Sequence, residues 1–122
     1  MFYLFLFLTA KGIENDNTEK GGKTLSSEDC FDMRSKVIAL LRNELPVLRA
    51  KARVSQEDIA NKIGISRQTY SSIETGKREM SWTTFLALIA FFQNTESTKQ
   101  MLNSIEGLSK GLENIVDPDN EK

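Results

Sequence analysis

Apolar residues recur at helical spacing from Met33 onward. The pattern predicts helices over residues 33–42, 44–52, 56–63, 67–75, 82–92 and about 97–115. No alternating pattern typical of β-strands occurs outside the N-terminal tip, and no segment repeats. The chain of 122 residues is long enough for one small domain with tails, and this domain is predicted to be all-α.

The first two predicted helices are separated at Asn43. Val37, Ile38 and Leu41 share one face of residues 33–42, and Asn43 is expected to cap the second helix. Pro46 then falls in the first turn of residues 44–52, where its missing N–H costs little.

Residues 55–76 carry the most specific local pattern, SQEDIANKIGISRQTYSSIETG. Ser55 and Asp58 have the spacing of a capping box, and Gly64 can end that helix with a positive φ. Ser66 caps the next helix, which Gly76 ends. Two short helices across a three-residue turn predict a helix-turn-helix. Its inward positions are Ile59, Ala60, Ile63, Ile65, Tyr70 and Ile73.

The last predicted helix carries an apolar seam spaced four and three residues apart: Met101, Ile105, Leu108, Leu112 and Ile115. Gly107 and Gly111 weaken it as an isolated coiled coil. Two interpretations stay open. The seam packs back over Trp82, Phe91 and Phe92, which we favour with some contribution to dimerisation, or it pairs mainly with its copy.

The N-terminal 32 residues are expected to be a tail that adds nothing to the fold. The apolar tip, residues 1–8, is shorter than the roughly 20 residues of a membrane span and lacks a preceding basic region. Residues 11–29 are charged and rich in Gly, Asn and Ser, as linkers are. We expect translation to start at or near Met33; the alternative is that the tip contacts a membrane or a partner.

Charge divides the chain into a basic centre and acidic flanks. Residues 34–83 hold ten Lys/Arg and five Asp/Glu, whereas the remainder holds six and twelve. A basic domain suits a polyanionic partner. The lone Cys30 fits a reducing, cytoplasmic compartment, and without histidine no Cys/His zinc site can form. No catalytic constellation or phosphate-binding glycine loop is present, so no enzyme, cofactor, metal or small-molecule ligand is expected.

Residues 43–92 resemble the phage Cro/repressor helix-turn-helix family, often called the Xre family. The resemblance rests on matching pairs and a motif: Leu48-Arg49, Ser55-Gln56, Ala60, Gly64 and the ending Ile73-Glu74-x-Gly76-Lys77-Arg78. It implies a compact five-helix repressor-like DNA-binding domain over residues 33–93, here with an additional N-flanking helix. Residues 94–116 would add a C-terminal amphipathic helix and residues 117–122 a disordered tail.

The resemblance also implies roles for single residues. Gln56 would bond a phosphate at a helix N-terminus, and Arg67 and Gln68 would read bases. Lys77 and Arg78 would contact phosphates, Tyr70 could reach one with its hydroxyl, and Glu74 would be a structural acid paired within the domain. The residues expected to contact DNA are Gln56, Ser66, Arg67, Gln68, Thr69, Tyr70, Ser71, Ser72, Lys77 and Arg78.

The expected function is therefore sequence-specific transcription regulation. A repressor that binds double-stranded DNA as a homodimer is the favoured form, and activation stays open. An alternative is an antitoxin-like protein that uses residues 93–122 for a protein partner.

Overall fold

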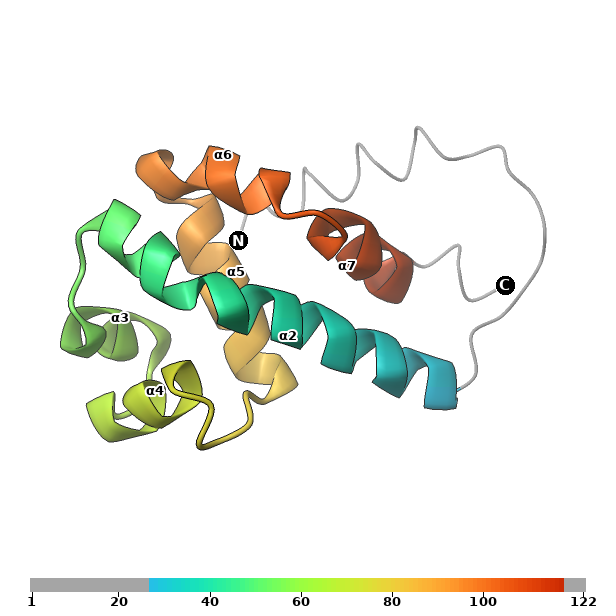
Figure 1. Cartoon of the computed structure of the whole chain (residues 1–122), viewed down its shortest axis with the longest axis horizontal. Coiled ribbons are helices and arrows are strands. Elements are labelled where there is room, and N and C mark those ends of the chain that lie inside the picture. The colour runs from blue at the N-terminus through green and yellow to red at the C-terminus, as the bar shows by residue number, and fades with distance from the viewer. Residues whose placement is uncertain (1–26, 118–122) are drawn as a thin grey trace.

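Six helices and no strand make up residues 27–117, the part of the chain that this computed structural model describes (Figure 1). The all-α prediction is confirmed for these residues. The helices are α2 (Ser27–Ala52), α3 (Gln56–Ile63), α4 (Arg67–Glu74), α5 (Trp82–Gln93), α6 (Glu96–Ser104) and α7 (Leu108–Val116). The long α2 runs the length of the fold and packs against α4, α5, α6 and α7.

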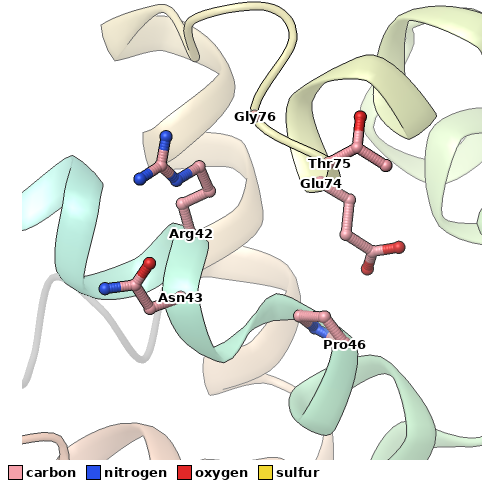
Figure 2. A pocket seen from close by; sticks show the side chains of 6 residues that line it. All are labelled: Arg42, Asn43, Pro46, Glu74, Thr75 and Gly76. Carbon is pink, nitrogen blue, oxygen red and sulfur yellow. The ribbon is translucent and has the colours of Figure 1, made fainter.

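The prediction of two helices separated at Asn43 is wrong, because α2 is continuous for 26 residues. Leu41, Leu45 and Leu48 are fully buried on one face, and a break at Asn43 would remove part of that face from the core. Pro46 lies inside the helix but is exposed, beside an open pocket that Arg42 also lines (Figure 2). Solvent can therefore serve the Arg42 carbonyl that proline leaves without a helical partner.

The boundary of the N-terminal tail is also corrected, since α2 begins at Ser27 and not at Met33. Cys30 and Met33 pack against the core, which gives this extra segment an apolar contact. Glu28 and Asp29 lie in the first turn, where negative charge is favourable. The apolar tip and most of the predicted linker lie outside the described residues. None of the described helices is long and apolar enough to cross a membrane.

The core lies under α2 and joins α3 and α4, the two helices of the helix-turn-helix, to α5. Fully buried side chains come from each of them: Leu41, Leu45, Leu48, Ile59, Ala60, Tyr70, Phe85, Leu88 and Phe92. Ala60 is buried as predicted, whereas Ile63 and Ile65 are only partly buried and lie at the edge of the core. The helix-turn-helix is thus held on one side by a continuous apolar core.

The single C-terminal helix that the seam predicted is two helices. The helix is interrupted between Ser104 and Leu108, where Gly107 has a φ of 86°. Both α6 and α7 pack on α2, and Leu108 and Leu112 are buried there. An ideal Cβ on Gly111 would lie 2.5 Å from Val37 Cγ1, so the glycine permits close approach of α7 to α2.

The packing interpretation of the seam is confirmed in outline, because α7 packs on α2 and α6 packs on α5, the helix that carries Phe91 and Phe92. Phe92 is buried, and Phe91, its neighbour on α5, meets it edge to face. Trp82 is instead covered from α2, since the Arg34 guanidinium lies 5.0 Å from its ring centroid. A contribution of the seam to dimerisation stays a prediction.

Candidate nucleic-acid interface

The first helix of the helix-turn-helix, α3, is fixed at both ends by local signals. The Ser55 hydroxyl accepts the backbone N–H of Asp58 at 3.0 Å, and the Asp58 carboxylate accepts that of Ser55 at 3.2 Å. The predicted capping box is therefore present. Hydrogen bonding to the Asp58 carboxylate, first from the backbone N–H of Ser55 and then from its hydroxyl, holds the pKa of Asp58 below its ordinary value. Gly64 ends α3 with a φ of 84° and donates to the Ala60 carbonyl.

The second helix, α4, starts at the predicted residue. The Ser66 hydroxyl accepts the backbone N–H of Thr69 at 3.0 Å, as an N-cap should. The helix ends at Glu74, one residue earlier than predicted, and Gly76 follows with a φ of 85°. Because both ends are capped, α4 is a defined rod of only eight residues.

The two sides of α4 differ in chemistry. Tyr70 and Ile73 are buried against the core, whereas Arg67 and Gln68 are exposed at the first turn. Ser71 and Ser72, one turn later, are partly buried. A helix fixed by its apolar side and exposing polar groups near its N-terminus has the arrangement of a recognition helix.

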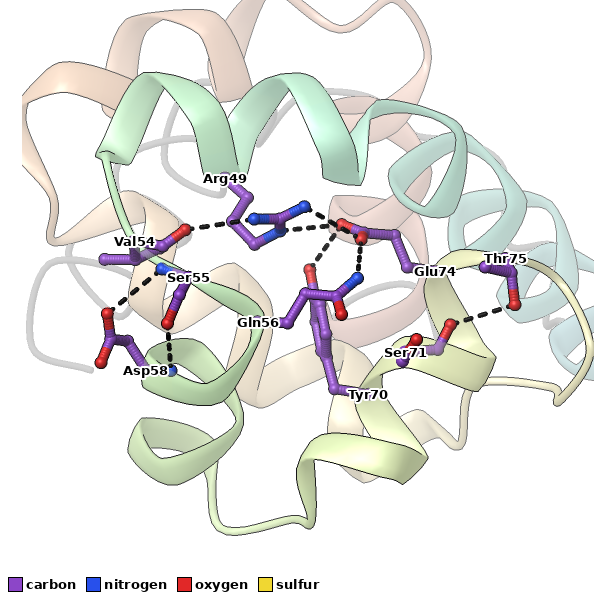
Figure 3. A network of polar contacts seen from close by, with 9 residues as sticks. All are labelled: Arg49, Val54, Ser55, Gln56, Asp58, Tyr70, Ser71, Glu74 and Thr75. Carbon is purple, nitrogen blue, oxygen red and sulfur yellow. Dashed lines mark hydrogen bonds and ion pairs between the residues drawn. The ribbon is translucent and has the colours of Figure 1, made fainter.

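One carboxylate joins three helices (Figure 3). Glu74 Oε2 accepts from Arg49 Nε at 3.2 Å and from the Tyr70 hydroxyl at 3.1 Å. Glu74 Oε1 accepts from Gln56 Nε2 at 2.6 Å and from Arg49 Nη2 at 3.3 Å. The Glu74 side chain is only 6% exposed, so these bonds lie in a mainly desolvated place. We call these four residues the Glu74 network.

The Glu74 network fixes α4 to α2 and α3. The hydrogen bond between Arg49 and Glu74 raises the pKa of Arg49, whereas burial of the guanidinium acts to lower it. The fork of this guanidinium fits a carboxylate through two N–H groups. Arg49 also donates to the Val54 carbonyl at 3.3 Å, which ties the turn after α2 to the same point. The prediction that Glu74 is paired within the domain is confirmed.

The structure corrects the placement of Tyr70, which was expected to reach a phosphate. Its side chain is fully buried and its hydroxyl donates to Glu74, so it does not lie on the surface. Burial is the main reason that the pKa of Tyr70 is raised well above its ordinary value, followed by the negative charge of Glu74. Tyr70 is therefore left out of the DNA-contacting surface.

Gln56 takes part in the Glu74 network and still has one free donor. It is the first residue of α3 and is partly buried, and its amide nitrogen already donates one hydrogen to Glu74. An amide nitrogen carries two hydrogens, so one donor is left. The phosphate contact implied for Gln56 stays a prediction that depends on this second donor.

The loop after α4 returns along the helix. Lys77 and Arg78 are exposed, and the backbone N–H groups of both donate to the Ser72 carbonyl. Arg78 Nη1 reaches Thr69 Oγ1 at 3.2 Å, and the Ser66 hydroxyl lies 2.9 Å from the same oxygen. The structure therefore brings Ser66, Thr69 and Arg78 together at the start of α4.

The sequence interpretation missed Arg49, Gln56 and Tyr70 as partners of one acid. Arg49 and Glu74 both belong to the motif that carried the resemblance, but they are 25 residues apart and their pairing depends on the tertiary fold. Only the spacing of four residues between Tyr70 and Glu74 was a local signal, since such pairs share a helix face.

The geometry defines a helix-turn-helix DNA-binding domain. A family model described as a helix-turn-helix domain matches residues 40–98. The chain is 40% identical over 52 residues to an uncharacterized HTH-type transcriptional regulator of Methanocaldococcus jannaschii, a match that spans 43% of this chain and 79% of the relative. The chain belongs to the HTH-type transcriptional regulators and is a DNA-binding transcriptional regulator. No solved structure matches it significantly.

Proposed function

We propose that the protein is a Cro/repressor-type regulator that binds an operator as a homodimer and represses transcription by occupying a promoter. The observation that carries the proposal is the exposed pair Arg67 and Gln68 at the first turn of a helix whose other side is fixed in the core. The N-terminal residues of a recognition helix are the ones that reach base edges in the major groove.

The side chains on α4 suit base reading. The Arg67 guanidinium can pair with O6 and N7 of guanine, and the Gln68 amide can pair with N6 and N7 of adenine. Ser71 and Ser72 lie one turn further along the helix, where short hydroxyls can approach the same groove. Among residues 27–117, none forms a hydrogen bond or ion pair with the side chains of Arg67 and Gln68, so both are available to DNA.

The flanks of α4 supply positions for phosphate contacts. The N-terminus of α3 presents unpaired backbone N–H groups and the second amide hydrogen of Gln56. Ser66 and Thr69 lie at the N-terminus of α4, and the exposed Lys77 follows its other end. Such contacts orient the protein on the duplex and make binding depend on salt.

A homodimer would place two recognition helices in successive major grooves, roughly 34 Å apart, on a site with two-fold symmetry. One short helix reads only a few base pairs, so a second copy supplies the length that a specific site needs. The partner-binding alternative for residues 93–122 gains no support from an exposed apolar seam, since Leu108 and Leu112 are buried on α2.

The test is a substitution of Arg67 in the full chain. Arg67→Ala should weaken binding to the selected operator by roughly 1–3 kcal/mol and relax the preference at one base pair of each half-site. Lys110→Ala, on the exposed surface of α7, removes an equal charge away from α4 and serves as the control. Equal weakening of Arg67→Ala on operator and random DNA would contradict a base-reading role.

A further inference from the structure

Arg78 belongs to the loop after α4, yet its side chain ends at the start of that helix. Its backbone N–H donates to the Ser72 carbonyl at 3.1 Å, while its Nη1 donates to Thr69 Oγ1 at 3.2 Å. Ser72 and Thr69 are three residues apart, so they lie on the same side of the helix one turn from each other. The guanidinium is therefore folded back toward the N-terminal turn, where base edges are read.

Thr69 is well placed to hold this guanidinium. Its backbone N–H donates to Ser66 Oγ at 3.0 Å, and the Ser66 hydroxyl lies 2.9 Å from Thr69 Oγ1. The threonine oxygen thus lies beside the N-cap residue Ser66, on a helix that Tyr70 and Ile73 fix to the core. A β-branched side chain in a helix also has few rotamers. The Arg78 head is attached to a rigid point on the recognition helix and not to a flexible neighbour.

Most of the donors of Arg78 are left over. A guanidinium has five N–H groups in a fixed fork, and the bond to Thr69 uses one on Nη1. No acidic side chain among residues 27–117 forms an ion pair with Arg78, which is itself exposed. The edge formed by Nε and Nη2 is the geometry that matches O6 and N7 of guanine.

We propose that Arg78, oriented by the Thr69 hydroxyl, reads a base edge and is a specificity-determining residue of this regulator. The inference rests on the proposed operator binding. It differs from the phosphate contact that the resemblance implied for Arg78, because the structure fixes the guanidinium on the base-reading helix. Lys77, whose side chain has no such attachment, keeps the phosphate role.

Arg78→Lys separates the two roles because it keeps the charge and removes the fork. We first select bound sites from a random DNA pool with the unchanged full-length chain, then measure affinities for the best site and for its single-base variants. For Arg78→Lys we expect the preference at one base pair of each half-site, outside those affected by Arg67→Ala, to fall roughly tenfold to a hundredfold. Lys77→Ala should weaken all sites equally.

Uniform weakening by Arg78→Lys or Arg78→Ala across all sites, with a shallower salt dependence, would show a phosphate contact and overturn the inference. Unchanged binding by Arg78→Ala would also overturn the inference, because the bond between Arg78 and Thr69 would then only hold the loop in place. Failure of the unchanged chain to enrich any sequence is a different result, because it refutes the proposed operator binding itself.

Thr69→Val tests the orienting role. It removes the hydroxyl and keeps the branched shape and the backbone bond to Ser66. We expect a partial loss of preference at the Arg78-dependent base pair only, and no further loss there when Thr69→Val is combined with Arg78→Lys. Additive losses at that base pair would contradict the coupling.

Thr84→Val is a matched control, because it removes the hydroxyl that accepts from the N-cap serine of another helix. Ser81 and Thr84 make the same pair of bonds at the N-terminus of α5, at 3.1 and 3.0 Å, without an arginine. Thr84→Val should lower thermal stability about as much as Thr69→Val while leaving every base preference unchanged. A loss of base preference in Thr84→Val would show that destabilisation alone explains the Thr69 result.

Discussion

Glu74→Gln is the substitution that most directly perturbs the join between the recognition helix and the rest of the fold. The carboxylate receives four hydrogen bonds, and every partner is a donor. A glutamine offers one acceptor oxygen and an NH₂ group that would face one or more of those donors. The variant therefore loses the ion pair with Arg49 and leaves buried donors unsatisfied.

The size of the effect follows from burial. Removing one partner of a fully buried ion pair costs about 3–5 kcal/mol. The Glu74 side chain is 6% exposed but that of Arg49 is 24% exposed, so solvent can partly compensate the remaining charge. We expect a loss of about 2–4 kcal/mol in the free energy of unfolding, which lowers the Tm of a domain of this size by roughly 10–25 °C.

The assay is urea denaturation at pH 7, followed by circular dichroism, with Glu106→Gln as the control. Glu106 is exposed between α6 and α7, and its substitution changes the charge by the same amount. The control should stay within about 0.5 kcal/mol of the unchanged protein. A Glu74→Gln variant as stable as this control would refute the reasoning, because the Glu74 network would then contribute nothing measurable.

Two further predictions concern Tyr70 and Gly111. The raised pKa of Tyr70 means that the folded state favours the protonated phenol, so this contribution is complete below the ordinary pKa of about 10 and is lost as pH rises above it. Tyr70→Phe should lose about 1–2 kcal/mol at pH 7 with its hydrogen bond to Glu74, yet show a shallower fall in stability between pH 8 and 11; parallel pH curves would contradict the assignment. Gly111→Ala places a Cβ against the stiff side chain of Val37, and overpacking of about 1–3 kcal/mol outweighs a gain in helix propensity of up to about 1 kcal/mol. Thermal unfolding should show a net loss, and Val37→Ala should cost less in the Gly111→Ala background than alone; equal costs would mean that the two side chains do not meet.

The helix-turn-helix could be predicted from sequence because its signals are local. Ser55 and Ser66 cap helices within three residues, and Gly64 and Gly76 take the positive φ that ends them. These features depend on a few neighbouring residues and therefore form in the same way whatever the surrounding fold.

The longer elements could not be predicted in the same way. Pro46 favoured a helix start, but the burial of Leu41, Leu45 and Leu48 on one face supports a continuous helix through it. Conversely, the heptad spacing of the C-terminal seam favoured one helix, whereas Gly107 breaks it so that both halves can pack on α2. Tertiary packing decided both cases.

The site shows the same division between local and distant information. The exposure of Arg67 and Gln68 follows from helical periodicity around Tyr70 and Ile73. Tyr70 points inward and donates to Glu74, whose negative charge is balanced by Arg49 from α2. No local sequence pattern predicts that Arg49 is this partner.

Selection of bound DNA from a random pool, with the full chain and with Arg67→Ala in parallel, tests the central claim most directly. We predict enrichment of a two-fold symmetric site whose half-sites are about 10 base pairs apart, with one base pair of each half-site losing its preference in the variant. Absence of enrichment, or an enriched site that is identical for both proteins, would contradict reading of the major groove by α4.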